Sequence, residues 1–347
     1  MRSLRSVFAS VEMTVRLKPE SRITNIEIWY NISMPFKNNS HIKSVKIGEV
    51  TWTHVSNITK KEIDALKRHF GFGSIDLKEA LPPLQRPKLV ARDGYLFMIL
   101  LYPVFDRKDK TIRSSEVDFF IDADNLVTIN SDGLAPLITL FEKCHKADKK
   151  QRDSVCNAGD VAHLLYNLLE QQLEAIFPMI IHLANDIDEI ESRMFQEFEK
   201  DLIQELLRVK TNIVNVRKAI QGHKTVIRQL IKESEGRFPI DKLEAYFERL
   251  VEHTKELWDT LENQKETINA LHETNVSLID FRINEIMKRL QVFAVIVFPL
   301  TLLAAIFGMN TLYTPFVNHE YGFAIIVGLM LLGTVGMLIY FKIKRWL

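Results

Sequence analysis

Hydrophobic residues are distributed in three different ways along the chain. Up to residue 158, β-rich stretches such as "GYLFMILLYPVF" and "VDFFIDADNLVTIN" alternate with turn signals and with helical stretches such as "TKKEIDALKRHF". From residue 159 apolar residues recur at spacings of three and four, as expected of helices. Near the C-terminus two long runs lack charge. This pattern predicts an α/β domain over 1–158, followed by long helices and two apolar C-terminal helices.

Turn residues divide the helical region. Pro178 should kink or break the first helical run, and Gly236 with Pro239 marks a turn, which predicts a helical hairpin region over 159–238. Between Pro239 and Pro299 there is neither Gly nor Pro, so about 59 residues can form one helix roughly 90 Å long. We therefore predict a stalk helix over 239–290 that continues into the first apolar run and packs against other long helices or copies of itself.

The two uncharged runs are long enough to cross a membrane. No Asp, Glu, Lys or Arg occurs from 291 to 319 or from 321 to 341, and a bilayer core of about 30 Å needs about 20 helical residues. The pattern predicts membrane helices at 291–313 and 322–341, an outer loop at 314–321 and a basic tail at 342–347.

Basic residues lie just before the first uncharged run and just after the second. Lys288 and Arg289 precede the first run, and Lys342, Lys344 and Arg345 follow the second. Because Lys and Arg gather on the cytoplasmic side of short loops, we expect a multi-pass protein of the cytoplasmic membrane with both termini in the cytoplasm.

Composition excludes several classes of function. The formal net charge of +1 gives no reason to expect nucleic-acid binding. "GFGSID" at 71–76 lacks the Lys and spacing of a phosphate loop, and no nucleophile elbow or zinc-protease motif is present, so we expect neither an enzyme nor an organic cofactor. The two cysteines, Cys144 and Cys156, fit a reducing compartment and imply no disulfide framework.

A line of residues with a period of 3.5 follows the predicted stalk into the membrane, which is typical of a supercoiled bundle. Polar groups inside a span usually face a bundle interior or a water-filled path. The alternative is that Gln291 lies at the interface and Thr301 bonds its own helix. Because two helices cannot enclose a pore, a pore here requires a ring of subunits. The line contains Glu273, Ser277, Asp280, Asn284, Met287, Gln291, Ala294, Phe298, Thr301, Ala305 and Gly308.

Several stretches resemble one known family. "IFGMNTLY" matches the Gly-Met-Asn signature of the CorA-type magnesium and divalent metal ion transporters, at the outer end of the next-to-last membrane helix. "NEIMKRLQVFAVIVFPLTLLAAIFGMN" is similar to the pore helix of that family, "LQRPKLVARDGYLFMILLYP" to its cytoplasmic strand region and "KIKRWL" to its basic tail. The resemblance implies a funnel-shaped homopentamer.

The resemblance also implies roles along the pore. Gly308, Met309 and Asn310 would form the selectivity entrance, where neutral oxygens bind the waters of hydrated Mg²⁺. Leu290 and Met287 correspond to an apolar constriction that gates by dewetting. The remaining pore-lining candidates are Thr301, Phe298, Ala294, Gln291 and Asn284, of which Phe298 is larger than the residue expected at its level.

Acidic residues are candidates for two further roles. Glu273 and Asp280 can form rings of charge at the cytoplasmic mouth, or else an exposed stalk face. In the family, cytoplasmic Mg²⁺ bound between subunits regulates opening. The corresponding candidate ligands are Glu79 with Glu248 or Glu252, although surface carboxylates are common and favour an ordinary solvated role.

These features predict a divalent cation channel that mediates Mg²⁺ uptake, driven by the membrane potential and gated by intracellular Mg²⁺. The outer loop "TLYTPFVNHEYG" has Glu320 as its only acid, which weakens the attraction of cations and leaves the ion open. A Zn²⁺, Co²⁺ or Ni²⁺ transporter of the same superfamily, proton-coupled as in the ZntB-type branch, is the alternative. A membrane-tethered coiled-coil scaffold explains the stalk but not the Gly-Met-Asn sequence.

Overall fold

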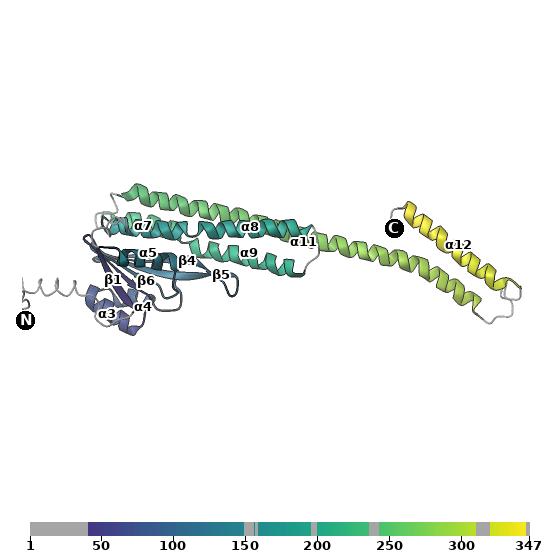
Figure 1. Cartoon of the computed structure of the whole chain (residues 1–347), viewed down its shortest axis with the longest axis horizontal. Helices are drawn as coiled ribbons and strands as arrows, with labels where there is room; N and C mark the ends of the chain where they lie inside the picture. The colour runs from purple at the N-terminus through teal and green to yellow at the C-terminus, as the bar shows by residue number, and fades with distance from the viewer. Residues whose placement is uncertain are drawn as a thin grey trace, which may run out of the picture. The chain divides into compact units, whose positions relative to one another are not determined.

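The computed structural model of the chain describes residues 41–148, 156, 159–195, 200–235, 243–309 and 320–344. The chain divides into two compact units, Met1–Ile268 and Asn269–Leu347. The first unit contains a sheet covered by helices, and the second contains the end of a long helix together with a C-terminal apolar helix (Figure 1).

The sheet of the first unit has six strands in the order β1-β2-β6-β5-β4-β3. All neighbouring strands are antiparallel except β2 and β6, which are parallel. Asp93 and Gly94 join β3 to β4 in a two-residue turn, and Gly94 has a φ of 87°, which glycine adopts without strain. The strands are β1 (Ile42–Ile47), β2 (Val50–Val55), β3 (Lys88–Arg92), β4 (Tyr95–Asp106), β5 (Thr111–Ile121) and β6 (Asn125–Ile129).

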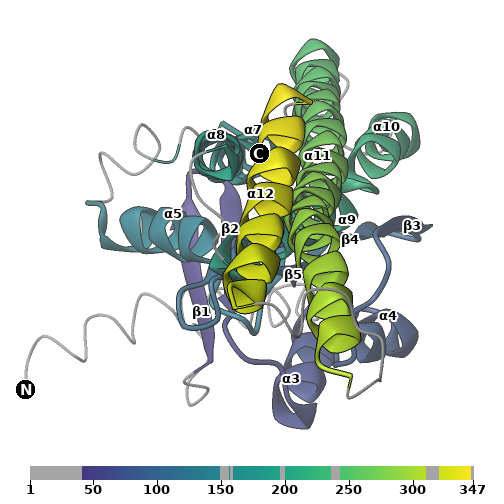
Figure 2. The same ribbon diagram turned by 90° about the vertical axis from the view of Figure 1, so that its right-hand side faces the viewer.

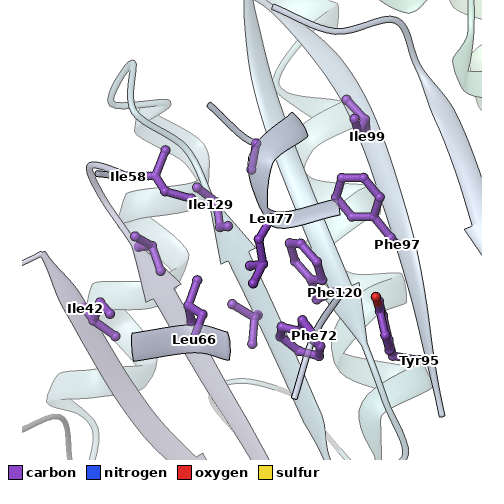
Figure 3. Close-up of a cluster of buried hydrophobic side chains, with 13 residues drawn as sticks. Ile42, Ile58, Leu66, Phe72, Leu77, Tyr95, Phe97, Ile99, Phe120 and Ile129 are labelled. Atoms are coloured by element: carbon purple, nitrogen blue, oxygen red, sulfur yellow. The ribbon is translucent and has the colours of Figure 1, made fainter. Parts of the chain in front are cut away.

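One face of the sheet packs against α3 (Lys60–Phe70) and α4 (Ser74–Glu79). Thr59 and Glu62 form a capping box that begins α3, and Gly71 ends it in the left-handed conformation. Phe72 stacks on Phe120 with ring centroids 4.6 Å apart, in the middle of the apolar cluster drawn in Figure 3. This cluster fixes the two helices against the sheet.

The other face packs against α5 (Ala135–Lys146), α7 (Val161–Glu174) and α9 (Lys200–Ile220). Trp52 of β2 meets Phe141 of α5 edge to face at 5.0 Å. Asn212 of α9 accepts a hydrogen bond from the Ile112 amide at 2.9 Å, and Asn215 donates one to the Ile112 carbonyl at 2.7 Å. Because helices cover both faces, β4 is an almost continuous apolar run rather than an alternating one.

The helical region breaks where Pro178 predicted a break. α7 ends at Glu174, and α8 (Phe177–Met194) begins with Pro178 in its first turn, where a missing N–H costs nothing. After α9, the chain continues into α10 (His223–Ser234). The Nε2 atom of His223 donates a hydrogen bond to the Leu101 carbonyl at 2.7 Å. The turn expected at Gly236 and Pro239 lies outside the described residues.

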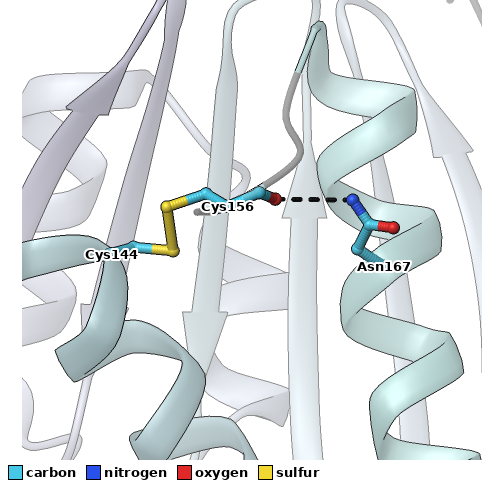
Figure 4. The surroundings of a disulfide bond; sticks show 3 residues. All are labelled: Cys144, Cys156 and Asn167. Atoms are coloured by element: carbon cyan, nitrogen blue, oxygen red, sulfur yellow. Dashed lines mark hydrogen bonds between the residues drawn. A yellow bond between two sulfur atoms is a disulfide. The ribbon is translucent and has the colours of Figure 1, made fainter. Parts of the chain in front are cut away.

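The expectation that the cysteines form no disulfide is wrong. Cys144 and Cys156 are bonded, with their Cα atoms 5.7 Å apart, and both are buried (Figure 4). Asn167 of α7 donates a hydrogen bond to the Cys156 carbonyl at 3.4 Å. The chain returns to the last turn of α5 after 12 residues, which brings the two Cα atoms within the distance that a disulfide spans. Sequence spacing alone does not reveal that return.

The predicted long helix is present. α11 runs from Glu244 to Phe307 over 64 residues and includes Pro299. Its first part belongs to the first unit, where Phe247, Leu250 and Leu257 are completely buried. α12 (Gly322–Ile343) lies beside the end of α11 in both views (Figures 1 and 2). Both helices contain windows long and apolar enough to cross a membrane, with mean hydropathies of 2.5 and 2.4.

Candidate functional site

The end of α11 carries the start of the Gly-Met-Asn sequence. Gly308 donates a hydrogen bond to the Ala304 carbonyl at 2.9 Å, and Met309 donates to the Ile306 carbonyl at 3.3 Å, so the last turn tightens. A Cβ atom on Gly308 would lie only 3.0 Å from the Ala304 oxygen. Met309 is 58% exposed. Glycine therefore suits position 308 because of close backbone approach, and Asn310 lies outside the described residues.

The pore-line candidates of α11 are uncovered in the single chain. Phe298 is 71% exposed, and Leu290 and Met287 are also exposed although they are large and apolar. Asn284, Gln291 and Thr301 are exposed as well, whereas Ala294 is half-buried. A row of exposed apolar and uncharged polar side chains on one helix face needs a covering surface or a water-filled path.

The opposite face of α11 is the covered one. Val292 is buried, and Ile296, Pro299, Leu303 and Phe307 are half-buried. At 3.6 residues per turn, these positions lie across the helix from the line through Gln291, Phe298 and Thr301. α12 is the other described helix of this unit and lies beside α11 (Figures 1 and 2). The single chain therefore covers one side of the end of α11 and leaves Gln291, Phe298 and Thr301 exposed.

Thr301 bonds its own helix, as the alternative interpretation of this residue supposed. Its hydroxyl donates to the Val297 carbonyl at 2.9 Å. Ser277, on the same line, likewise donates to the Glu273 carbonyl at 3.0 Å. These bonds satisfy the hydroxyl protons but leave oxygen lone pairs on an exposed face, so they are compatible with contacts to water.

The acidic candidates at the cytoplasmic mouth lie on exposed positions of α11. Glu273 and Asp280 are both exposed, two turns apart on the same line. A single chain therefore leaves both carboxylates free to contact solvent. Rings of charge at this level need several copies of the helix, as the resemblance implied.

The candidate regulatory ligands are not gathered into a metal site within one chain. Glu79, at the end of α4, forms an ion pair with Lys88 of β3. Glu248 and Glu252 are exposed on α11, and Glu252 lies 3.9 Å from Lys255. Among the described residues, no three His, Cys, Asp or Glu side chains converge in a metal-binding arrangement.

Two acidic residues near Glu79 were missed by sequence reasoning. Asp118 of β5 is only 3% exposed, is hydrogen-bonded to Glu116, and has an Oδ1 atom without a partner among the described residues. Burial and then the negative charge of Glu116 raise the pKa of Asp118 well above its usual value. The signal was present in "SSEVDFFI", because residues two apart on a strand share a face.

Both carboxyl groups line a cavity of about 670 Å³ beside the Pro82–Pro83 turn. Its wall also contains Asp132, which forms an ion pair with Arg113 at 3.4 Å, and Lys218 of α9. The cavity is thus lined by charges of both signs, and the same surroundings include Glu79 and Lys88, which act on Asp118 through their charges.

Comparisons with known proteins agree in fold and in family. The model of the family described as CorA-like Mg²⁺ transporter protein matches residues 48–345. A cobalt/magnesium transport protein CorA of Thermotoga maritima is 26% identical over 317 residues, covering 90% of this chain and 86% of that protein. The match thus includes the sheet, the long helix and both apolar helices.

Two solved structures share the fold. The complete CorA magnesium transporter from Methanocaldococcus jannaschii has a TM-score of 0.75 at 20% identity, with 86% of this chain and 92% of that chain covered. The ZntB cytoplasmic domain from Vibrio parahaemolyticus has a TM-score of 0.56 at 11% identity, with 72% and 96% covered. Because the family match extends over most of the sequence, the chain belongs to the CorA-like Mg²⁺ transporter protein family.

Proposed function

We propose that the chain forms a channel that carries Mg²⁺ into the cell across the cytoplasmic membrane. The observation that carries this proposal is the exposed line on α11, which runs from Asn284 to Gly308 inside a membrane-crossing helix of a transporter family. The curated relative from Thermotoga maritima is named for cobalt and magnesium transport, which supports the same class of substrate.

Several copies of the chain would build the wall of the path. One pair of apolar helices cannot enclose a pore, and the more buried positions of α11 lie opposite the line. In a ring of identical subunits, each line faces the axis and its exposed apolar residues are covered by neighbouring copies. The family resemblance implies a homopentamer, with membrane helices at 291–313 and 322–341 and both termini cytoplasmic.

The chemistry of the entrance suits a hydrated ion. Mg²⁺ loses its octahedral water shell reluctantly, so neutral oxygens that bind those waters allow both entry and release. Gly308, Met309 and Asn310 are the residues assigned to this entrance. Farther in, Leu290 and Met287 form the constriction that closes by dewetting, because both are large, apolar and exposed. Met287 lies on the line, and Leu290 lies beside it, three residues farther along the helix.

The membrane potential is sufficient to drive uptake. An elementary charge gains about 2.3 kcal/mol per 100 mV, so a divalent cation gains about twice that when it enters a negative interior. Glu273 and Asp280 concentrate cations at the inner mouth in this scheme. Mg²⁺ held between copies by Glu79 with Glu248 or Glu252 would close the channel when the internal concentration is sufficient.

A Zn²⁺, Co²⁺ or Ni²⁺ transporter is the second candidate. The likeness to a ZntB cytoplasmic domain favours it, because the same fold occurs in that branch. Glu320 is the only acid of the outer loop, so electrostatic attraction does little to select an ion there. Inhibition of flux by hexaamminecobalt, which mimics hydrated Mg²⁺, would support hydrated-ion selection, whereas its failure to inhibit would favour the second candidate.

The proposal is tested by ion flux into liposomes that contain the purified protein. With an inward-negative potential, the wild type should take up Mg²⁺, and Asn310→Ala should reduce the uptake by about tenfold, the effect of one lost polar interaction of about 1.4 kcal/mol. Phe293→Ala is the matched control, because Phe293 is 67% exposed but lies off the line. Absence of wild-type flux, or an Asn310→Ala variant with unchanged flux, would refute the channel.

A further inference from the structure

Charges of opposite sign are segregated among the helices of the first unit. From 161 to 192, which includes α7 and most of α8, the sequence has six acids and no Lys or Arg. From 206 to 232, which includes most of α9 and α10, it has seven Lys or Arg and no Asp or Glu. α7 and α8 are therefore acidic, whereas α9 and α10 are basic.

Several of these charged side chains are exposed and unpaired. Glu174 ends α7 and Asp188 lies on α8, and both are exposed. Lys218 of α9 is exposed, as are Arg228 and Lys232 of α10. None of these five side chains forms an ion pair among the residues that the structure describes. Such charges are available to a surface of the opposite sign.

Apolar side chains are exposed beside these charges. Ile181 of α8 is 58% exposed, and it lies seven residues before Asp188, on the same side of the helix. Leu207 and Val214 of α9 are 48% and 46% exposed and share one side with Lys218. Apolar residues among polar ones are typical of surfaces that bind another protein. We call the side with Ile181 and Asp188 the acidic face and the side with Val214 and Lys218, continued on α10, the basic face.

The two faces point away from each other in a single chain. The first part of α11 lies between them, because Gln264 donates a hydrogen bond to the Ile180 carbonyl of α8 at 2.9 Å, and the ring of Trp258 lies 4.4 Å from the guanidinium of Arg217 on α9. Figure 2 shows α8 and α10 on opposite sides of α11. The acidic face and the basic face of one chain therefore cannot meet.

We propose that the acidic face of one copy docks on the basic face of the next copy of this chain. A second copy is the fitting partner because it supplies the complementary charge, and because its exposed apolar residues can cover those of its neighbour. Since two different surfaces meet, the contact is heterologous and repeats around a closed ring. This inference rests on the ring of subunits in the proposed channel, and it specifies which surfaces of the first units meet there.

The first test locates the contact in the full-length protein in detergent micelles. A carbodiimide joins a carboxylate to a lysine amine that it touches, and it takes up the water that is lost. Covalent dimers should form, and their cross-linked peptides should join α7 or α8 to Lys224 or Lys232 of α10, which a single chain keeps apart. In 1 M salt, where the Debye length falls to about 3 Å, the yield should drop about threefold or more. Dimers without this pair of peptides would overturn the proposal.

The second test reverses the charges of each face. Lys218→Glu together with Arg228→Glu should raise the dissociation constant of the assembly about tenfold, because attractive contacts become repulsive. The constant is measured by light scattering over a dilution series in micelles. Adding Glu174→Lys and Asp188→Lys to the same chain should return it to within about twofold of wild type, because both faces are then reversed.

A matched control makes the same change in charge elsewhere. Lys60→Glu together with Lys61→Glu alters two exposed positions of α3, which packs against the other face of the sheet, and should leave the constant unchanged. An equal loss in this control would overturn the proposal. So would a loss that the reversed acidic face does not restore, because the basic face would then meet another partner, such as lipid head groups.

Mg²⁺ flux separates this inference from the proposed channel. Wild-type protein that forms the cross-link between α10 and α7 or α8 but carries no Mg²⁺ would refute the channel and leave the interface in place. Wild-type protein that carries Mg²⁺ but never forms this cross-link would refute the interface and leave the channel in place.

Discussion

At the residue scale, single side chains show how this chain combines burial with charge. Asp118 lies buried in the sheet, where burial and the negative charge of Glu116 disfavour its ionised form and raise its pKa. Gly308 is fitted to the end of a helix, where a Cβ atom would come 3.0 Å from a carbonyl oxygen. In both cases the neighbouring atoms decide the property: they determine the charge state of Asp118 and the space available for a side chain at position 308. The predicted helix 291–313 includes Gly308, whereas α11 ends one residue before it, at Phe307. The burial of Asp118 becomes evident only in the folded sheet.

Asp118 makes stability depend on pH. Its folded pKa lies above the unfolded value of about 3.9, so between these two values the folded state holds a proton that the unfolded state has lost. The stability of the wild type therefore falls as pH rises through that window. Asp118→Asn keeps the shape without the charge, and should raise the thermal midpoint by roughly 2–4 °C at pH 8 and by less at pH 5.

This prediction is checked by thermal unfolding of the full-length protein at the two pH values. Asp124→Asn, a change at an acid in the turn between β5 and β6, serves as the control and should leave the pH dependence in place. A gain for Asp118→Asn that is the same at pH 5 and at pH 8 would show that the charge is not responsible.

At the element scale, the sequence predicted those helices whose limits are marked by prolines and by long hydrophobic patterns. The uninterrupted stretch between two prolines predicted α11, and Pro178 predicted the boundary of α7 and α8. α9 is amphipathic by sequence, but nothing in its pattern says that Asn212 and Asn215 hydrogen-bond β5. The Cys144–Cys156 bond was missed for the same reason, because it depends on where the chain returns in space. Local periodicity predicts where helices begin and end. Contacts between residues far apart in the sequence become evident only in the folded structure.

The junction of α9 and α10 tests this packing. A Cβ atom on Gly222 would lie 2.4 Å from Cβ of Pro87, in the segment before β3. Gly222→Ala should therefore destabilise the fold by about 1–3 kcal/mol, the usual range for overpacking. The thermal midpoint of the variant is compared with that of Gln221→Ala, an exposed neighbour that should be close to wild type. An unchanged midpoint for Gly222→Ala would mean that the two segments are not in contact.

The first membrane helix makes a separate prediction about pore width. Phe298 is larger than the residue expected at its level and is 71% exposed on the pore line. If it narrows the path, Phe298→Ala should raise Mg²⁺ flux into liposomes roughly twofold or more, because a wider pore offers less resistance to a hydrated ion. Phe293→Ala changes an equally exposed side chain off the line and should leave the flux unchanged. Equal fluxes for wild type and Phe298→Ala would remove Phe298 from the constriction.

At the scale of the whole molecule, one face of α11 consists of side chains that the single chain leaves exposed. The first unit buries its own core, whereas the membrane windows are only 6% buried inside the chain. Lipid can cover apolar residues, but the exposed amide side chain of Gln291 requires a polar partner or water. Family membership and the uncovered line together support a ring of subunits around an ion path. At the sequence level, the line with a period of 3.5 leads to the Gly-Met-Asn sequence, and the family resemblance implied a ring of subunits.

The most direct measurement is the accessibility of the line to water while the protein carries Mg²⁺. Thr301→Cys lies on the line, and Phe293→Cys is an exposed position off it, 67% exposed in the single chain. In liposomes, a charged methanethiosulfonate reagent should block Mg²⁺ flux through Thr301→Cys and leave Phe293→Cys unaffected, with hexaamminecobalt protecting Thr301→Cys. Block of Phe293→Cys but not of Thr301→Cys, or of neither, would contradict an ion path along this face of α11.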